Sequence, residues 1–580
     1  MRRRRAGWVF VALTAALVLL VWKLGEVQIT QHAVFRAAKL SQTAVQVSLE
    51  PMARGAILDR NLLDLTGRHA AARIIVIPHL LPEREGLAAE LAAILGADAG
   101  EVRMHLDSPG VLPYPLSRVQ EEAVLARSWP GVGVLPVAFR YGERPVATHI
   151  LGHLGPSSPA TSKVAAEPGR LFGKSGIELY YESELAGGHP AAVVRSFVDA
   201  RGLPLPGLGL VVEARKGNDG RHDVRLTLDL AVQEIVEEVM DRRIQAGAVV
   251  VLDTATGDIL ALASRPQYHP DRVGESLGSG VADVFNNQAL ALYQPGSIFK
   301  IVVAAAALEE GLVTLDTTFA CGGHEERLVR CWSAEGHGAV GLTEAFAVSC
   351  NPAFARLALQ LGSGKVAEYA RRFKLDRQAV IGFPFPPDQR QDFDLISRPY
   401  NLVNAGIGQG PVLVSPLQIT ALVAAVGGDG VYRPPRLVSE VRRRNEVVRV
   451  FEPGAPERIM TAGTARAMEA LLKSVTAGEL GEAARVPGWG SAGKTGTAQT
   501  GEGNSNAWFS GYVPADKPRY AITVFVRGGG SGGQSAAPVF REIAAQILAS
   551  EHSPSGGGLL SPGRVNKMVD DGDFPKNDER

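Results

Sequence analysis

Three short sequence patterns supply the side chains that an acyl-transfer reaction needs. In chain order they are Ser297-Ile298-Phe299-Lys300, Ser349-Cys350-Asn351 and Lys494-Thr495-Gly496-Thr497. A serine hydroxyl becomes a nucleophile when a nearby base removes its proton, and a desolvated lysine can be that base near neutral pH. A second hydroxyl and an amide can pass a proton and orient a substrate. The set therefore predicts serine-based acyl transfer.

Ser297 stands where a buried helix is expected to begin. Gln294-Pro295-Gly296 is typical of a turn, and residues 301–307 form an apolar helical run. The i, i+3 spacing places Lys300 on the same helix face as Ser297. Free N–H groups at a helix N-terminus also suit a developing oxyanion. A plain helix N-cap is the alternative interpretation of Ser297, because serine is common at that position.

The other two patterns need support from their context. Pro352 disfavours helical geometry at Asn351, which predicts a loop or a helix start there, although Ser349 and Asn351 also suit N-capping. Two further segments match the patterns, Ser491-Ala492-Gly493-Lys494 and Lys174-Ser175-Gly176. The first lies in a glycine-flanked extended stretch, so its serine and lysine are not expected on one helix face.

The segment before Thr495 also matches a phosphate-binding loop. Gly488-Trp489-Gly490-Ser491-Ala492-Gly493-Lys494-Thr495 fits G-x-x-x-x-G-K-[ST], which requires a buried strand before it and a helix that begins at its lysine. Residues 482–487 are polar and end in proline, and the glycines after Lys494 cannot sustain a helix. We expect instead an exposed strand that binds a substrate carboxylate and donates an N–H to an oxyanion hole.

The elements that must position these residues form a helical middle between two groups of strands. A chain of 580 residues exceeds one hydrophobic core. Strands are expected at 223–229, 248–252 and 258–263, and again at 491–500, 506–512 and 520–527. Helices are expected at 231–244, 297–310, 342–361, 366–374, 416–426 and 537–550. This order predicts one sheet, built from both ends of a domain at 223–550, with helices packed on it.

The N-terminus has the pattern of a membrane anchor. Four arginines at 2–5 precede an apolar run at 6–22. A helix of this length rises about 25 Å, which is short but workable for a bilayer. We predict a cytoplasmic tip at 1–5, a transmembrane helix at 6–24 and a single-pass protein of the cell membrane with its catalytic domain outside the cytoplasm. A cleaved signal peptide is the alternative, but no small-x-small cleavage site follows the run.

Composition and cysteine content limit the other possibilities. Lys+Arg and Asp+Glu balance at 60 each, so nothing indicates a nucleic-acid-binding protein. Cys321 and Cys331 flank a short glycine-containing segment, and either a disulfide or two free thiols fits the spacing. A zinc site is not expected, because the sequence contains no C-x-x-C pair and His324 lacks a partner at ligand spacing. No cofactor is predicted, and residues 551–580 are expected to be a disordered tail.

The ordered patterns resemble the motif triplet of penicillin-binding proteins and serine β-lactamases. The surroundings are similar to the class B transpeptidases over roughly residues 1–550. The segments that carry this likeness are Arg54-Gly55-Ala56-Ile57-Leu58-Asp59-Arg60-Asn61, Gly142-Glu143-Arg144-Pro145 with Leu151-Gly152, Gly173-Lys174-Ser175-Gly176-Ile177-Glu178, residues 293–300, Gly406-Ile407-Gly408-Gln409-Gly410 with Pro416-Leu417-Gln418, and Trp508-Phe509-Ser510-Gly511-Tyr512. The resemblance implies an α/β (α+β) transpeptidase domain with a five-stranded antiparallel sheet flanked by helices. An elongated dimerisation-type pedestal at 25–222 would connect it to one transmembrane helix.

The resemblance also implies a role for each residue of the triplet. Ser297 would attack a D-Ala-D-Ala stem peptide of peptidoglycan and release terminal D-Ala, and β-lactams would trap the same serine. Lys300 would be the general base, Ser349 the proton relay, and Asn351 a partner of Lys300 and of the substrate amide. Lys494 would be a source of positive potential, and Thr495, Gly496 and Thr497 would form the substrate-binding strand. The N–H groups of Ser297 and Thr497 would form the oxyanion hole.

Three alternatives and one partner follow from the same resemblance. A β-lactamase would not need the anchor or the pedestal, whereas a β-lactam sensor or a non-catalytic wall-assembly scaffold would use them without turnover. The segment before residue 223 shows no sign of a glycosyltransferase domain. Glycan polymerisation would therefore come from a partner, expected to be a SEDS-family membrane protein together with other wall-assembly proteins.

Overall fold

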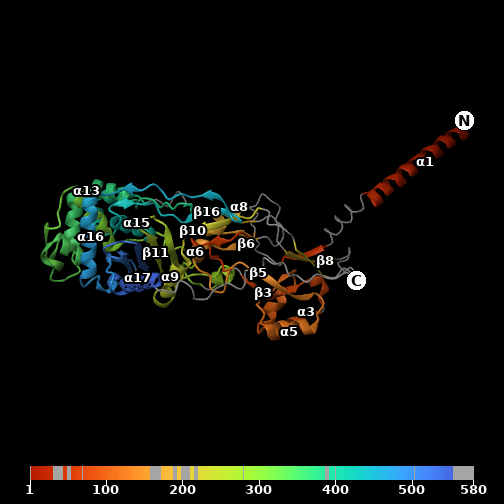
Figure 1. Ribbon diagram of the computed structural model, residues 1–580, viewed down its shortest axis with the longest axis horizontal. Coiled ribbons are helices and arrows are strands. Elements are labelled where there is room, and N and C mark those ends of the chain that lie inside the picture. The colour runs from red at the N-terminus through yellow and green to blue at the C-terminus, as the bar shows by residue number, and fades with distance from the viewer. Residues whose placement is uncertain are drawn as a thin grey trace.

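The computed structural model gives the arrangement of most of the chain (Figure 1). The residues it describes are 2–30, 44–48, 54–67, 69–81, 83–156, 171–186, 192–197, 210–214, 220–278, 280–385, 391–398, 400–501 and 503–552. Along the long axis of the molecule, an N-terminal helix is followed by a smaller mixed region and then by a large domain of sheet and helices. The predicted tail lies outside the described residues, except for Glu551 and His552.

The large domain is built around a five-stranded antiparallel sheet. Strands β11 (Gly247–Asp253) and β12 (Ile259–Arg265) form a hairpin, and β21 (Tyr520–Val526) pairs with the other edge of β11. Strands β20 (Ser505–Val513) and β19 (Ala492–Gln499) complete the order β12-β11-β21-β20-β19. The two ends of the domain therefore meet in one sheet, as predicted.

Helices cover both faces of this sheet (Figure 1). Helices α9 (Leu230–Arg243) and α17 (Ala537–His552) pack on one face. The opposite core contains α11 (Lys300–Glu309), α15 (Pro416–Gly427) and α16 (Ala462–Ala477). Because side chains alternate along a strand, successive residues of β11 enter the two cores in turn. This explains why β11 is apolar along most of its length.

The helical middle contains a break beside Asn351, where Pro352 predicted a loop or a helix start, so the continuous helix expected at 342–361 is wrong. The helix expected at 342–361 is divided into α12 (Leu342–Ala347) and α13 (Asn351–Arg372). Ser349 separates them with a φ of 55°, a left-handed conformation that no helix can continue. The hairpin β13 (Thr318–Cys321) and β14 (Gly338–Gly341) lies just before α12. Smaller elements of the domain are η3 (Gly296–Phe299), α10 (Val273–Gly278), η4 (Gly323–Glu325), η5 (Phe393–Ser397), α14 (Asn401–Gly406), η6 (Glu482–Ala484), η7 (Gly532–Ala536), β15 (Val431–Tyr432) and β18 (Glu457–Arg458).

The strand predicted at 223–229 forms but does not join the central sheet. Strand β10 (Asp223–Leu226) pairs in parallel with β2 (Ile57–Leu58) and antiparallel with β16 (Val438–Arg443), which in turn pairs with β17 (Glu446–Val450). The prediction of one sheet was wrong for this strand, because its partners come from chain segments that no local pattern connects. This second sheet joins the segments on either side of residue 222.

The smaller region contains a helix-covered sheet and several short elements. Strands β4 (Gly110–Val111) and β5 (Val132–Phe139) flank β3 (His69–Val76). The helices α3 (Arg84–Leu95), α4 (Ala99–His105) and α5 (Arg118–Arg127) contribute to the same hydrophobic core. The remaining elements are η2 (Pro78–Leu80), α6 (Thr148–Leu151), β6 (Leu154–Pro156), β7 (Leu171–Gly173), α7 (Gly176–Tyr180), α8 (Glu182–Leu185), β1 (Ala44–Ser48), β8 (Ala192–Phe197) and β9 (Leu210–Ala214).

Buried charges connect this region internally and to the large domain. Glu178 is fully buried and forms ion pairs with Arg54, over 2.8 Å, and with Arg140. Asp59, also fully buried, accepts a hydrogen bond over 3.2 Å from the backbone N–H of Leu230 at the start of α9. A buried charge is tolerated when it is paired in this way. Two of the segments that carry the family likeness, residues 54–61 and 173–178, therefore meet through a buried ion pair.

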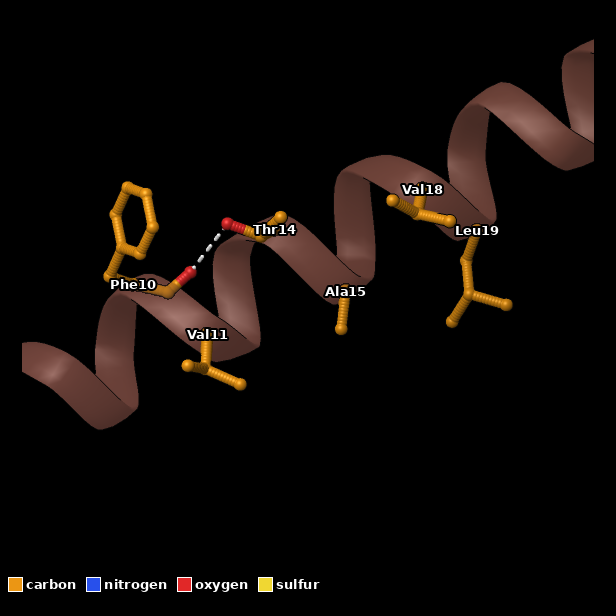
Figure 2. A pocket seen from close by; sticks show the side chains of 6 residues that line it. All are labelled: Phe10, Val11, Thr14, Ala15, Val18 and Leu19. Carbon is orange, nitrogen blue, oxygen red and sulfur yellow. Dashed lines mark hydrogen bonds between the residues drawn. The ribbon is translucent and has the colours of Figure 1, made fainter.

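Helix α1 (Arg2–Gly25) lies apart from the rest of the fold and leads into a π-helical turn, η1 (Glu26–Thr30) (Figure 1). Figure 2 shows its segment from Phe10 to Leu19, in which the Thr14 hydroxyl donates a hydrogen bond to the Phe10 carbonyl over 2.9 Å. The predicted span at 6–24 falls on this helix. By length and hydropathy, no helix in the described part of the chain qualifies as a membrane-crossing segment.

Candidate active site

A tight turn places Ser297 beside strand β19. Ser297 belongs to the 3-10 turn η3, which leads directly into α11. Gly296 has a φ of +53°, and its N–H donates a hydrogen bond to the Gly408 carbonyl over 2.9 Å. A side chain at Gly296 would meet the Thr497 carbonyl oxygen at 2.3 Å. Glycine is therefore required here so that the strand can pass close to the serine.

Lys300 is fully buried and its ammonium has three hydrogen-bond acceptors. The Nζ atom donates to the Ser349 carbonyl over 2.7 Å, to the Ser349 hydroxyl over 3.1 Å and to Asn351 Oδ1 over 2.8 Å. Burial lowers the pKa of Lys300 from 10.5 to about 7, because the charged form loses its hydration. A substantial fraction of Lys300 is therefore neutral at physiological pH, as a general base must be.

The Ser349 hydroxyl connects the lysine to the candidate nucleophile. It donates a hydrogen bond to Ser297 Oγ over 2.8 Å while it accepts one from Lys300. The left-handed backbone of Ser349 directs both its carbonyl and its hydroxyl at the lysine. Asn351 follows at the first position of α13, so the break between α12 and α13 delivers both residues to the site. The structure thus brings together the four residues that the first two patterns predicted.

Lys494 lies in the middle of strand β19, and its environment corrects one expectation. Although β19 is an edge strand, Lys494 is fully buried and Thr495 is only 7% exposed, whereas an exposed strand was expected. The Nζ atom of Lys494 lies 5.5 Å from the centre of the Phe346 ring, so α12 contributes to its burial. Burial, with a smaller contribution from the charge of Lys300, lowers the pKa of Lys494 well below its usual value.

Gly496 and Thr497 face the turn that carries Ser297. A side chain at Gly496 would lie 2.8 Å from both Ile298 Cγ1 and the Pro295 carbonyl oxygen, so only glycine permits this contact. Thr497 is exposed, and its hydroxyl accepts a hydrogen bond from the Gly532 N–H over 3.3 Å. An exposed hydroxyl beside the candidate nucleophile is available to a substrate. The sequence analysis overlooked Gly532. It quoted Gly408 only as part of a family-like segment and did not predict its hydrogen bond to the Ser297 turn.

The competing sequence patterns do not form sites of their own. The Ser491 hydroxyl is buried and donates to the Ala484 carbonyl over 2.8 Å, and no helix face joins it to Lys494. The phosphate-loop interpretation fails for the same reason, because its lysine lies within a strand and not at the start of a helix. Lys174 lies in the smaller region, immediately after β7.

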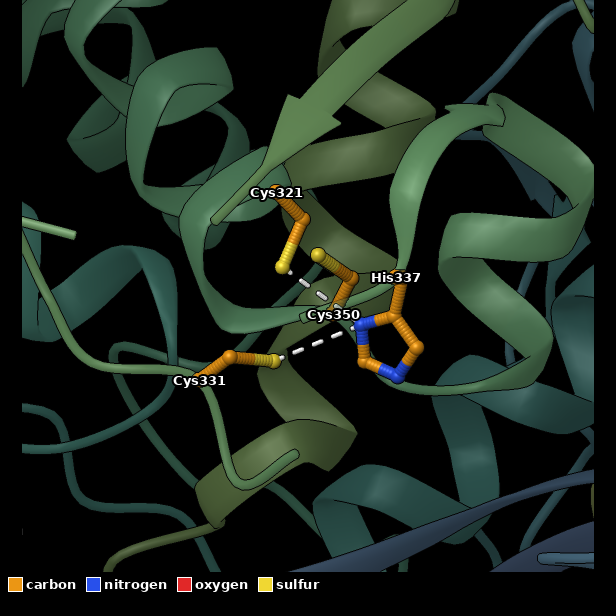
Figure 3. Close-up of side chains that lie close together, drawn as sticks. All are labelled: Cys321, Cys331, His337 and Cys350. Carbon is orange, nitrogen blue, oxygen red and sulfur yellow. Dashed lines mark hydrogen bonds between the residues drawn. The ribbon is translucent and has the colours of Figure 1, made fainter. Parts of the chain in front are cut away.

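Beside the candidate catalytic residues lies a cluster that the sequence analysis missed. Cys321, Cys331, Cys350 and His337 converge, with all four candidate ligand atoms within 4.8 Å of one another (Figure 3). All three cysteines are free thiols, so the disulfide alternative for Cys321 and Cys331 is not formed. The sequence analysis considered only His324, which is exposed and lies outside this cluster, whereas the fold brings His337 to the three cysteines.

The family comparisons agree with this fold. Residues 247–545 match the penicillin-binding protein transpeptidase domain, and residues 49–219 match the penicillin-binding protein dimerisation domain. Stage V sporulation protein D of Bacillus subtilis (strain 168) is 29% identical, across 93% of this chain and 85% of that protein. Peptidoglycan D,D-transpeptidase MrdA of Salmonella typhimurium (strain SL1344) is 25% identical, across 93% and 95%.

Solved structures show the same likeness. The D,D-transpeptidase domain of a peptidoglycan glycosyltransferase from Eggerthella lenta matches with a TM-score of 0.53 and 26% identity, over 63% of this chain and 97% of that chain. A chain from a peptidoglycan synthase complex that coordinates polymerisation and crosslinking matches with a TM-score of 0.65. It covers 96% of this chain and 100% of that chain at 24% identity, which shows a common fold.

The fold and the arrangement of Ser297, Lys300, Ser349 and Lys494 define a serine acyl-transfer enzyme of the transpeptidase class. The chain belongs to the penicillin-binding protein family, since its transpeptidase domain fills more than half of its length. The additional dimerisation domain confirms the predicted class B membership.

Proposed function

We propose that this chain crosslinks peptidoglycan as a D,D-transpeptidase, through an acyl-enzyme on Ser297. One observation carries the assignment of the nucleophile: a hydrogen-bonded path runs from a fully buried lysine with a pKa of about 7 through Ser349 to the Ser297 hydroxyl. Such a path supplies both the base and the proton relay that a serine needs to attack an amide. The peptidoglycan substrate is supported by relatives whose names include peptidoglycan D,D-transpeptidase.

The reaction proceeds in two acyl transfers. Ser297 Oγ attacks the carbonyl carbon of the D-Ala-D-Ala bond, and its proton moves to neutral Lys300, directly or through Ser349. The N–H groups of Ser297 and Thr497 stabilise the oxyanion. The C–N bond then breaks, the departing amine of D-Ala takes a proton delivered through Ser349, and an ester remains on Ser297. The amine of a neighbouring stem peptide attacks this ester, forms the crosslink and restores the free serine.

The remaining site residues bind the substrate. Thr497 is the exposed hydroxyl next to Ser297, so we assign it, with the neighbouring Thr495, to the terminal carboxylate. Lys494 and Lys300 lie close enough for the charge of one to lower the pKa of the other, and a substrate carboxylate would relieve that repulsion. Asn351 holds Lys300 through Oδ1 and is positioned to receive the substrate amide. A β-lactam is expected to acylate the same serine.

We propose that α1 anchors the chain in the cell membrane, with residues 1–5 in the cytoplasm and residues 25–550 outside. The four arginines at its start and the apolar, exposed surface of α1 support this assignment. A glycan polymerase of the SEDS family would then be the partner, and the likeness to a chain from a peptidoglycan synthase complex supports such a partnership. Extraction of the full chain by carbonate at high pH, without detergent, would contradict the anchor.

Labelling with a fluorescent penicillin tests the catalytic assignment. The full chain in mild detergent is compared with Ser297→Ala and with Ser491→Ala, which removes the serine of the competing S-x-x-K match. We expect a stable adduct on the wild type and on Ser491→Ala and none on Ser297→Ala. An adduct on Ser297→Ala would refute the nucleophile, and rapid release of hydrolysed penicillin would indicate a β-lactamase.

A further inference from the structure

The four residues of the thiol cluster form a complete set of metal ligands. Cys321, Cys331, Cys350 and His337 each direct one ligand atom toward a common centre (Figure 3). The three thiols are buried and unpaired, and His337 is half-buried. Three thiolates and one imidazole form a common ligand set for structural zinc. The chain has only three cysteines in 580 residues, and all of them lie here.

The distances within the cluster suit tetrahedral zinc. Bonds of about 2.3 Å to sulfur and about 2.05 Å to nitrogen, at a tetrahedral angle, place the two ligand atoms about 3.5 Å apart. The sulfur atoms of Cys321 and Cys331 each lie 3.5 Å from His337 Nδ1. Two independent distances therefore agree with one central ion.

The surrounding backbone is folded to hold the ligands. Cys321 ends strand β13, and Cys331 donates its N–H to the Gly323 carbonyl over 3.1 Å. Gly323 and Gly336 have positive φ values and approach so closely that a side chain on either would overlap the other's backbone. Backbone N–H groups of Ser333 and Asn351 also point at the Cys331 sulfur. Such N–H donors stabilise thiolate ligands.

The cluster is continuous with the active site. Cys350 is the residue between Ser349 and Asn351, both of which hold Lys300. A second connection runs through Trp332, which follows Cys331: its indole N–H donates to the Val348 carbonyl over 2.8 Å. Fixing the sulfur of Cys350 therefore restricts the left-handed turn that delivers Ser349.

We propose that Cys321, Cys331, His337 and Cys350 bind one zinc ion, which holds the Ser349–Asn351 segment in place against Lys300. Four protein ligands leave no open coordination position, so the ion has a structural and not a catalytic role. Its positioning effect on acylation rests on the proposed function, whereas metal binding itself does not. Removal of the ion leaves Ser297 present and frees the segment that connects it to the base.

Cobalt binding tests the site without any variant. The full chain, purified in mild detergent and reduced under anaerobic conditions, is stripped with a chelator and titrated with Co²⁺. We expect one equivalent to produce the strong visible bands of tetrahedral cobalt with thiolate charge transfer, and Zn²⁺ to displace it. A spectrum like that of aqueous cobalt would overturn the proposal. So would a Cys321–Cys331 disulfide without metal in the freshly isolated native chain.

Two histidines of the same loop give a matched pair of variants. His337→Ala is expected to weaken zinc binding by more than the roughly 10–100-fold that loss of an outer-shell partner costs. His324→Ala removes an exposed histidine outside the cluster and is expected to bind zinc as the wild type does. Equal zinc content in the two variants would exclude His337 as a ligand.

Penicillin labelling then separates the metal proposal from the catalytic one. The Ser297→Ala variant is expected to bind one zinc ion and form no adduct. The zinc-free wild type is expected to acylate at least about tenfold more slowly than the zinc-loaded chain and to recover when Zn²⁺ is restored. Full acylation without zinc would refute the positioning role, whatever the cobalt titration shows. Acylation by zinc-loaded Ser297→Ala would refute the proposed nucleophile alone.

Discussion

The Ser349 hydroxyl donates to Ser297 Oγ over 2.8 Å and accepts from Lys300 Nζ over 3.1 Å. These two hydrogen-bond directions require a protonated Lys300, because an ammonium group can only donate. When Lys300 loses its proton, its lone pair can accept from Ser349, and the two hydroxyls can rotate so that Ser297 donates to Ser349. One geometry therefore serves both proton removal from the nucleophile and proton delivery to the leaving group.

Replacing Lys300 with alanine tests its role as base. We expect the second-order rate constant for penicillin acylation to fall by roughly 10²–10⁴, the usual contribution of general base catalysis. Stopped-time labelling measures the rate. Lys365→Ala is the control, since Lys365 pairs with Glu310 and Glu368 on the surface, and it should leave the rate unchanged. Wild-type acylation by Lys300→Ala would remove this lysine from the mechanism.

The acylation rate should depend on pH through Lys300. Its pKa of about 7 in the folded chain means that the neutral, reactive form increases as the pH rises through that value. We therefore expect the rate constant to rise from pH 5 to pH 9, with half of the maximum near pH 7. A pH series of labelling rates on the wild type measures the inflection. The residual acylation rate of Lys300→Ala should show no inflection near pH 7. An unchanged inflection in this variant would assign the titration to another group.

Local patterns were sufficient to predict the elements that carry the site. Strands β11, β12, β20 and β21 each contain an apolar run that predicts burial between helices, whereas β19 was predicted as a strand but expected to be exposed. The motif at Ser297 was recoverable because a turn, a serine, a lysine and an apolar helix follow one another in the chain. All of these signals lie next to one another in the sequence, so no knowledge of long-range contacts was needed to find them.

Other features depended on contacts between distant segments. Strand β10 pairs with β2 and β16. The alternation of its residues could predict a strand but not the sheet that it joins. The burial of Lys494 results from Phe346, which is far away in the chain. His337 is brought to the cysteines by β14, and the spacing of Cys321, Cys331 and Cys350 matches no short metal motif. A search for histidines near all three cysteines would have found it.

Gly296→Ala should impair the site through the backbone. A Cβ at this position would approach the Thr497 carbonyl to 2.3 Å, and its φ of +53° disfavours any side chain. We expect Ser297 to move away from β19 and acylation to slow at least about tenfold, with a lower melting temperature. Gly501→Ala, which has nothing within 4 Å of its new Cβ, is the matched control for labelling and thermal unfolding. Equal behaviour of the two variants would show that β19 and η3 can separate freely.

Glu178→Ala should destabilise the smaller region. Glu178 is fully buried and pairs with Arg54 and Arg140, which are 4% and 1% exposed, so its removal leaves two buried cations without their shared partner. Breaking such a buried pair costs about 3–5 kcal/mol. We expect limited proteolysis to cut the region before residue 220 much faster, while the separate transpeptidase core keeps its penicillin adduct.

The matched control is Glu122→Ala on the surface of α5. Glu122 pairs with Arg118 at 68% and 91% exposure, and such surface pairs contribute less than about 1 kcal/mol. Its cleavage rate should therefore remain close to that of the wild type. Equal protease resistance in Glu178→Ala and Glu122→Ala would mean that the buried cluster does not stabilise the region. Loss of the penicillin adduct in Glu178→Ala alone would show that the two regions unfold together, because β2, β10 and β16 form one sheet across them.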